Sequence, residues 1–427
     1  MRILVPARAA KSVGVCLVLG MMLALAGRAS AQFGEAAGIA EAMQPDYYKR
    51  DVVLVSQGLK LDEAQRVILN TLYEDYQTAF DEGVARMKQR FDDMREELQV
   101  GDKARILKLV FAPFREWAGE KQQLGAQFLA NVEVVLTEDQ LQQWPAVQRR
   151  LYRERNLHKG RLSGESLNLL DVVRDMKLDP RITAQLQPVL DAYEISLDRA
   201  LHMRDDPISG SNNPMLQSLE DQDPEKGQAA LQKHLERQIE VRNVNDEYIE
   251  RVAMALPEQL ATEFRLAALD RAYPRIYRET PVQRMFKVAR ELQGLDAAVL
   301  ESVIALESQF LAELAAINQT MLDALRKHEP ADALERAADF AKRIAGQQIE
   351  PKPDPMREKF AKREELFRTY ATRLHDLLTE DQFALLPGGY RWIETPASLQ
   401  NADAPLTKDG KFISKPAKRE SGFNKEN

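Results

Sequence analysis

A pattern that recurs three times at constant spacing constrains the fold of this chain more than any other feature. The pairs Leu61-Asp62, Leu178-Asp179 and Leu295-Asp296 lie 117 positions apart. Aligned without a gap, four later positions are apolar or aromatic in every copy: Leu69, Leu186, Val303; Leu72, Val189, Leu306; Tyr76, Tyr193, Phe310; and Phe80, Leu197, Leu314. Their steps of three or four residues mark one face of a helix, so each copy is predicted to begin with a long amphipathic helix packed through that face.

A second motif closes each copy. It reads LTEDQL at residues 136–141, ALPEQL at residues 255–260 and LTEDQF at residues 378–383, each time after a stretch with the pattern of an amphipathic return helix. We therefore predict an all-α fold of three tandem antiparallel helical modules at residues 45–160, 161–280 and 281–395. Each module should contain a short lead-in helix, a long helix, a return helix and a short closing helix.

Turn-forming residues suggest where the chain reverses. The first long helix is predicted from Asp62 to Gln99, with a reversal at residues 100–102. Further reversals are predicted at residues 205–224, around Pro330 and at residues 351–355. Residues 396–427 are polar and without periodicity, which predicts a disordered tail.

The polar residues of the closing motif fit the start of a helix. Thr137 can be the N-cap and Gln140 its partner in a capping box, while Leu136 and Leu141 can form a hydrophobic staple. Pro257 replaces the cap in the second copy, as proline suits a first helical turn. A role in metal coordination or proton transfer is the alternative, but each residue already has a structural task. The predicted capping positions are Asp62, Gln65, Leu136, Thr137, Gln140, Leu141, Leu378, Thr379, Gln382 and Phe383.

The first 31 residues have the three parts of a cleavable signal peptide: a basic start, an apolar run and the cleavage motif Ala29-Ser30-Ala31. We therefore expect a periplasmic or secreted protein. The only cysteine, Cys16, lies within this segment. Its removal also takes four basic residues and no acid, so the formal charge changes from −7 to −11. An acidic chain is not expected to bind nucleic acid, and no later segment is apolar enough for a transmembrane anchor.

The motifs also carry a family resemblance. LKLDEAQ at residues 59–65, followed by LTEDQL at residues 136–141, resembles the LTXXQ pattern of the Spy/CpxP-like periplasmic proteins. The resemblance implies small all-helical units, often in cradle-shaped dimers. It also implies ATP-independent capture of unfolded proteins, envelope-stress regulation or zinc resistance. The glutamine at position 65 is replaced by Ile182 and Val299 in the later copies.

The sequence offers little that indicates catalysis or metal binding. The histidines lie in different segments and none pairs with another at helical spacing, so no metal site or cofactor is predicted. They are His158, His202, His234, His328 and His375. The chain lacks the nucleophile and phosphate-binding motifs of common enzyme classes, so we predict no enzymatic activity.

Two stretches are candidates for partner contacts. The basic run at residues 149–161 could meet an anionic partner, but a charged helix exit between modules is the favoured interpretation. Met87, Phe91 and Met94 lie late in the first long helix and could form an adaptable partner-binding surface, because methionine accommodates varied surfaces.

These observations favour an exported binding protein, either an ATP-independent periplasmic chaperone or an envelope-stress adaptor. Its partners would be unfolded or partly folded envelope proteins. The alternative is a scaffolding protein of the envelope that docks one fixed partner, followed by a metal-responsive periplasmic protein. The sequence sets neither the client nor the oligomeric state.

Overall fold

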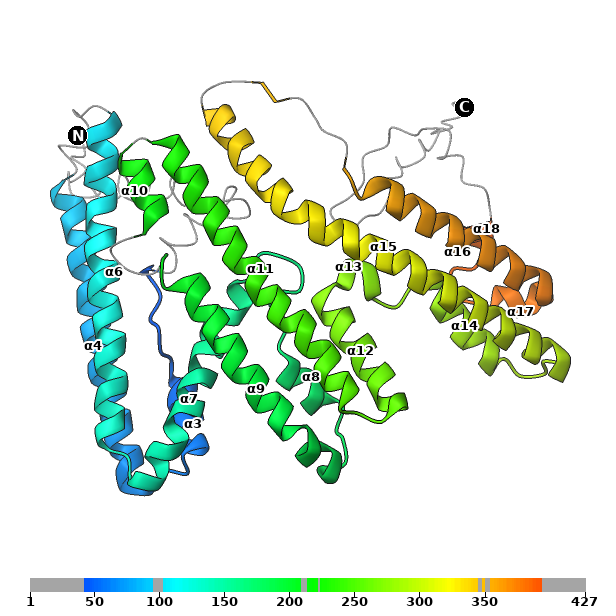
Figure 1. The fold of residues 1–427 in the computed structure, drawn as a ribbon, viewed down its shortest axis with the longest axis horizontal. Coiled ribbons are helices and arrows are strands. Elements are labelled where there is room, and N and C mark those ends of the chain that lie inside the picture. The colour runs from blue at the N-terminus through cyan, green and yellow to red at the C-terminus, as the bar shows by residue number, and fades with distance from the viewer. Residues whose placement is uncertain are drawn as a thin grey trace, which may run out of the picture. The chain divides into compact units, whose positions relative to one another are not determined.

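The computed structural model describes residues 42–94, 103–208, 213–221, 223–344, 348–349 and 354–393. Every regular element within these ranges is a helix, which confirms the predicted all-α class (Figure 1). The predicted signal peptide at residues 1–31 and the predicted tail at residues 396–427 lie outside the described residues.

The order of helices recurs along the chain. The first copy contains α3 (Lys49–Gly58), α4 (Glu63–Asp93), α6 (Lys103–Val134), α7 (Glu138–Asn156) and the 3-10 turn η1 (Leu157–Lys159). The second contains α8 (Leu169–Asp175), α9 (Pro180–Asp205), α10 (Pro214–Glu220), α11 (Pro224–Met254), α12 (Glu258–Ala272) and α13 (Pro274–Tyr277). The third contains α14 (Pro281–Glu291), α15 (Ala297–Ile344), α16 (Arg357–Leu377), α17 (Glu380–Ala384) and α18 (Tyr390–Ile393).

Contacts divide the chain into two compact units. The first comprises Met1–Ala268 and Glu329–Ile349, and the second comprises Leu269–His328 and Glu350–Asn427. This division does not separate the first copy from the second, so the three-module boundaries remain a prediction.

The first unit is built on helical hairpins. Helices α4 and α6 pack along each other, as do α9 and α11, while α7 packs against both α3 and α9 (Figure 1). Close approach within the first hairpin depends on Gly83 of α4. A Cβ atom at this position would overlap the indole ring of Trp117 on α6, and that ring is 2% exposed.

The second unit has its own apolar core. It is formed by α14, α16, α17 and the first part of α15. Phe310 lies at its centre, with its ring centroid 5.6 Å from that of Phe286 and 5.2 Å from that of Tyr370. Phe383 of the closing motif is fully buried in the same core.

The aligned positions of the repeat are core positions. Tyr76, Tyr193 and Phe310 are 4%, 0% and 0% exposed, which confirms the predicted packing of this column. The other columns are buried or half-buried in each copy.

The turn before each long helix is also shared. Lys60, Lys177 and Gly294 adopt φ angles of 52°, 49° and 79°, and each directly precedes the Leu-Asp pair of its copy. The aspartate that follows, in each case, caps the next helix by accepting a backbone N–H at 2.8 Å. The repeat therefore preserves a left-handed turn and a cap as well as an apolar stripe.

Helix boundaries correct one prediction and leave another open. The predicted reversal around Pro330 is wrong, because α15 continues through this residue to Ile344. Proline removes one helical hydrogen bond but does not end the helix, and the alanine-rich segment that follows has a high helix propensity. The predicted extension of α4 to Gln99 and the reversal at residues 100–102 fall outside the described residues.

Candidate functional site

The capping residues of the first copy form a coupled pair of helix starts. Asp62 caps α4 and Thr137 caps α7, each in a capping box with the glutamine three residues later. The two glutamines then meet. Gln65 Nε2 donates to Gln140 Oε1 at 2.8 Å, and Gln140 Nε2 lies 3.1 Å from Gln65 Oε1.

Each glutamine also reaches the turn before the other's helix. Gln65 Nε2 donates to the carbonyl oxygen of Val135 at 2.9 Å, and Gln140 Nε2 donates to that of Leu59 at 3.3 Å. The pair thus joins the opening and closing motifs, although its two members lie 75 positions apart in sequence. It is specific to the first copy, since Ile182 and Val299 replace Gln65 in the other two.

The later closing motifs differ in detail. In the third copy Thr379 caps α17 and Gln382 completes the capping box, while Leu378 and Phe383 are both buried in the second unit's core. In the first copy Leu136 packs against the core, but Leu141 is 38% exposed. In the second copy α12 begins at Glu258, directly after Pro257.

The predicted partner-binding residues divide between core and surface. Met87 is 3% exposed and packs with Phe80, Phe114 and Trp117, so the interpretation of its side chain as a binding surface is corrected to a core role. The apolar stripe indicated the buried face of α4, and α6 covers that face at this level. Phe91 is half-buried, with its ring 4.8 Å from that of Phe114.

Met94 is the C-cap of α4 and is half-buried. Its role in partner binding, like that of Phe91, stays a hypothesis.

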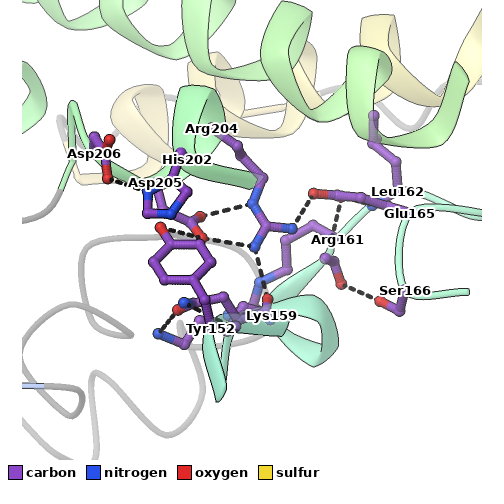
Figure 2. Close-up of polar contacts among 12 residues, drawn as sticks. Tyr152, Lys159, Arg161, Leu162, Glu165, Ser166, His202, Arg204, Asp205 and Asp206 are labelled. Carbon is purple, nitrogen blue, oxygen red and sulfur yellow. Dashed lines mark hydrogen bonds and ion pairs between the residues drawn. The ribbon is translucent and has the colours of Figure 1, made fainter. Parts of the chain in front are cut away.

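A buried charged cluster joins the first copy to the second, and sequence reasoning did not identify it. We call residues 157–168, between α7 and α8, the inter-copy loop. Figure 2 shows the guanidinium group of Arg204, from the end of α9, between the carboxylates of Glu165 and Asp205. Arg204 is 2% exposed and Glu165 is fully buried.

Every side of the Arg204 guanidinium group has an acceptor. Its Nε donates to Asp205 Oδ1 at 2.7 Å, Nη1 donates to Glu165 Oε1 at 2.8 Å, and Nη2 donates to the carbonyl of Asn156 at 2.7 Å. The other oxygen of Glu165 accepts the backbone N–H groups of Arg161 and Leu162 at 2.7 and 3.0 Å. The acceptors of this buried guanidinium group are all groups of the protein itself, which suits a structural joint.

Two further side chains hold the inter-copy loop. Asn245 on α11 donates to the carbonyls of Gly164 and Glu165 at 2.8 and 3.1 Å. Glu329 accepts from the hydroxyl of Ser163 at 2.9 Å and from its backbone N–H, and burial raises the pKa of this carboxyl group. The loop is therefore fastened by residues far away in sequence.

An aromatic stack lies at the edge of this cluster. The rings of Tyr152 and His202 are 3.7 Å apart and nearly parallel. The Tyr152 hydroxyl donates to Asp205 Oδ2 at 3.5 Å, and burial raises the pKa of the phenol. His202 lies between two acids, with Nδ1 3.3 Å from Asp206 Oδ1 and Nε2 3.8 Å from Asp198 Oδ1.

The basic run at residues 149–161 has internal acidic partners. Arg153 is 6% exposed, and its Nη1 lies 2.6 Å from Glu194 Oε1. Arg155 pairs with Asp46 at 3.5 Å and covers the ring of Tyr152. These contacts support the interpretation of the run as a packed helix exit.

The described residues also bear on metal binding and on membrane insertion. Among those residues, no cluster of three or more His, Cys, Asp or Glu side chains could hold a metal ion. A search of the same residues found no helix both long and apolar enough to cross a membrane. Leu61, Gln65 and Val135 line a shallow apolar crevice at the coupled helix starts, which is too narrow to hold a water molecule.

No family model, curated protein or solved structure matches this chain.

Proposed function

We propose that this chain is an exported helical binding protein, acting without ATP as a periplasmic chaperone or envelope-stress adaptor. It would act by reversible capture of partly unfolded chains on helical surfaces, not by catalysis. The resemblance of its opening and closing motifs to the LTXXQ pattern supports this proposal, as do the signal-peptide features of residues 1–31.

The structural observation that carries the proposal is a pair of exposed apolar residues at equivalent places in the repeat. Val134 and Met254 each lie two residues before the leucine of a closing motif, and they are 86% and 77% exposed. Burial of either side chain against a partner would be favourable by about 1.5–3 kcal/mol. The third copy departs from the pattern, with Asp376 at this position.

An aggregation assay tests the proposal. The mature chain, added at equimolar ratio without nucleotide, should suppress the aggregation of several unrelated denatured proteins. Substituting Val134→Ser together with Met254→Ser should weaken this suppression several-fold while leaving the helical circular dichroism signal unchanged. The matched control is Thr71→Ser, an exposed polar position on α4. Absence of suppression by the wild-type chain would contradict the proposal.

A scaffolding function in the envelope is the second candidate. The buried joint around Arg204 favours it, because a rigid connection between helical hairpins suits the docking of one fixed partner. In that case the chain would form a stable complex with a single envelope protein and would not protect unrelated denatured proteins. A metal-responsive function, the third candidate, would instead require zinc to raise the unfolding temperature.

A further inference from the structure

A segment before α3, irregular from Met43 to Tyr48, packs against helices of the first unit. We call the surface that it covers the groove; it includes Tyr76, Trp117, Lys121, Phe128 and Arg155. We call residues 42–48 the strap, since they run against α4, α6 and α7 before leading into α3 (Figure 1). Side chains of these helices bind its backbone. Trp117 Nε1 donates to the carbonyl of Ala42 at 2.7 Å, and the N–H of Asp46 donates to the Tyr76 hydroxyl at 2.8 Å.

Two adjacent side chains anchor the strap. Tyr47 is 6% exposed, with its ring 5.7 Å from that of Tyr76 and 5.0 Å from that of Phe128. Asp46 is held by two cations, with Lys121 Nζ at 3.2 Å and Arg155 Nη1 at 3.5 Å. Lys121 is itself 7% exposed, so a buried positive charge faces the acidic position of the strap.

A glycine on α6 allows the strap to lie close to the helix. At Gly125 on α6, a Cβ atom would lie 3.3 Å from Asp46 Oδ2 and 3.5 Å from the ring of Tyr47. The absence of a side chain there keeps the groove open at the two anchor residues. Proteins recognise extended peptides through backbone contacts that any sequence can make, together with pockets for particular side chains. The groove offers such backbone contacts, one charged pocket and one aromatic pocket.

We propose that this groove is a binding site for an extended peptide segment carrying an acidic residue followed by an aromatic one, and that the strap occupies it in the resting chain. The inference rests on the proposed binding function and specifies the chemistry of the partner. A partner segment would displace the strap, place its carboxylate between Lys121 and Arg155, and insert its ring beside Tyr76 and Phe128.

Occupation by the strap would weaken the binding of a partner by a calculable factor. A tethered segment acts at an effective concentration on the order of 1 mM. If the strap segment binds the groove with an intrinsic Kd of about 1 μM, a competing peptide would therefore bind the intact chain about a thousandfold more weakly than the vacated groove. Only a partner with high affinity for the groove, or one present at high local concentration, would thus displace the strap.

The test uses the mature chain and a fluorescein-labelled peptide with the sequence of residues 42–48. Fluorescence anisotropy should show at least about tenfold tighter binding to the Asp46→Ala/Tyr47→Ala chain than to the wild-type chain. A peptide carrying the same two substitutions should not bind. If the double variant loses its helical signal, Asp46→Ala alone replaces it, with the same ordering expected.

Charge reversal in the groove provides the control. In the double-variant chain Lys121→Glu should abolish peptide binding, whereas Lys88→Glu, on the exposed surface of α4, should leave it unchanged. No saturable binding to a helical double variant would overturn the inference and leave the strap a structural element. Dimerisation of the wild-type chain without affinity for free peptide would overturn it in favour of strap exchange between copies.

Aggregation suppression measured on the same preparations separates the two proposals. Suppression that persists without peptide binding would contradict the groove alone. Peptide binding without suppression of any denatured protein would contradict the chaperone function alone.

Discussion

At the scale of single residues, the turn before each long helix is held at some energetic cost. Lys60 and Lys177 adopt positive φ angles, a region that is unfavourable by about 1–2 kcal/mol for residues with a Cβ atom. The third copy has glycine at the same position, and Gly294 has open space where a Cβ would lie. The cost at this position is therefore a backbone effect that can be measured in isolation.

We predict that Lys60→Gly and Lys177→Gly each stabilise the protein by about 0.5–1 kcal/mol. Relief of the left-handed conformation should outweigh the greater flexibility of glycine in the unfolded chain. Gly294→Lys, the matched reverse substitution, should destabilise by a similar amount. Urea unfolding followed by circular dichroism measures the shifts, and an unchanged midpoint for Gly294→Lys would contradict this account.

A second residue-scale prediction concerns His234 on α11. Burial and the nearby cations Arg204 and Arg237 lower its pKa to about 4 from 6.5, and its Nδ1 is buried without a hydrogen-bond partner. The unfolded chain therefore binds a proton more readily than the folded one. The contribution of His234 to the free energy of unfolding is therefore fully present above pH 6.5. It is lost as the pH falls toward 4, which lowers the free energy of unfolding by up to about 3 kcal/mol.

Measuring the free energy of unfolding between pH 7 and pH 4 tests this prediction. His234→Gln should remove this part of the pH dependence. His158→Gln, at an exposed histidine, is the matched control and should leave the slope as in the wild type. If the free energy of unfolding of the His234→Gln chain depends on pH as in the wild type, His234 is not the source of this pH dependence.

At the scale of elements, the coupled starts of α4 and α7 behave as one unit. Gln65 is 8% exposed, and Gln65→Ala would remove its hydrogen bonds to the Gln140 amide and to the Val135 carbonyl. The expected loss of stability is about 1–3 kcal/mol. In a double-mutant cycle with Gln140→Ala, the coupling energy should be about 1 kcal/mol. Gln382→Ala removes a capping box that has no such glutamine pair, so it should lower the free energy of unfolding by less. If the effects of Gln65→Ala and Gln140→Ala simply add, the two glutamines are not coupled.

The same elements indicate how far sequence reasoning extends. The caps at Asp62, Thr137 and Thr379 could be read because a capping box is local, with donor and acceptor three residues apart. The burial of Tyr76 and its equivalents followed from helical periodicity. Met87 was misassigned because a stripe identifies the face of a helix but not where another helix covers it.

Contacts between distant parts of the chain could not be read in this way. Asp46 meets Tyr76 across 30 positions, and Ser163 meets Glu329 across 166. Neither pair leaves a periodic or motif-like signal. The strap and the inter-copy joint therefore emerge only from the folded structure.

At the scale of the whole molecule, the joint around Arg204 determines how firmly the first two copies are connected within the first unit. Arg204→Met would leave the fully buried Glu165 without its cation, and removing one partner of a buried ion pair typically destabilises by about 3–5 kcal/mol. Urea unfolding measures this loss. The backbone N–H groups of Arg161 and Leu162 should also exchange with solvent faster, because Glu165 would no longer hold them.

Two comparisons distinguish this joint from an ordinary ion pair. Arg251→Met removes a partner of Glu247 at a site where both side chains are 53% exposed, and it should cost less than about 1 kcal/mol. Replacing both members of the joint, with Glu165→Leu and Arg204→Met, should be less harmful than the sum of the two single changes, because no unpaired charge is then buried. If Arg204→Met costs no more than Arg251→Met, the joint does not connect the copies, and the argument for a rigid scaffold loses its structural basis.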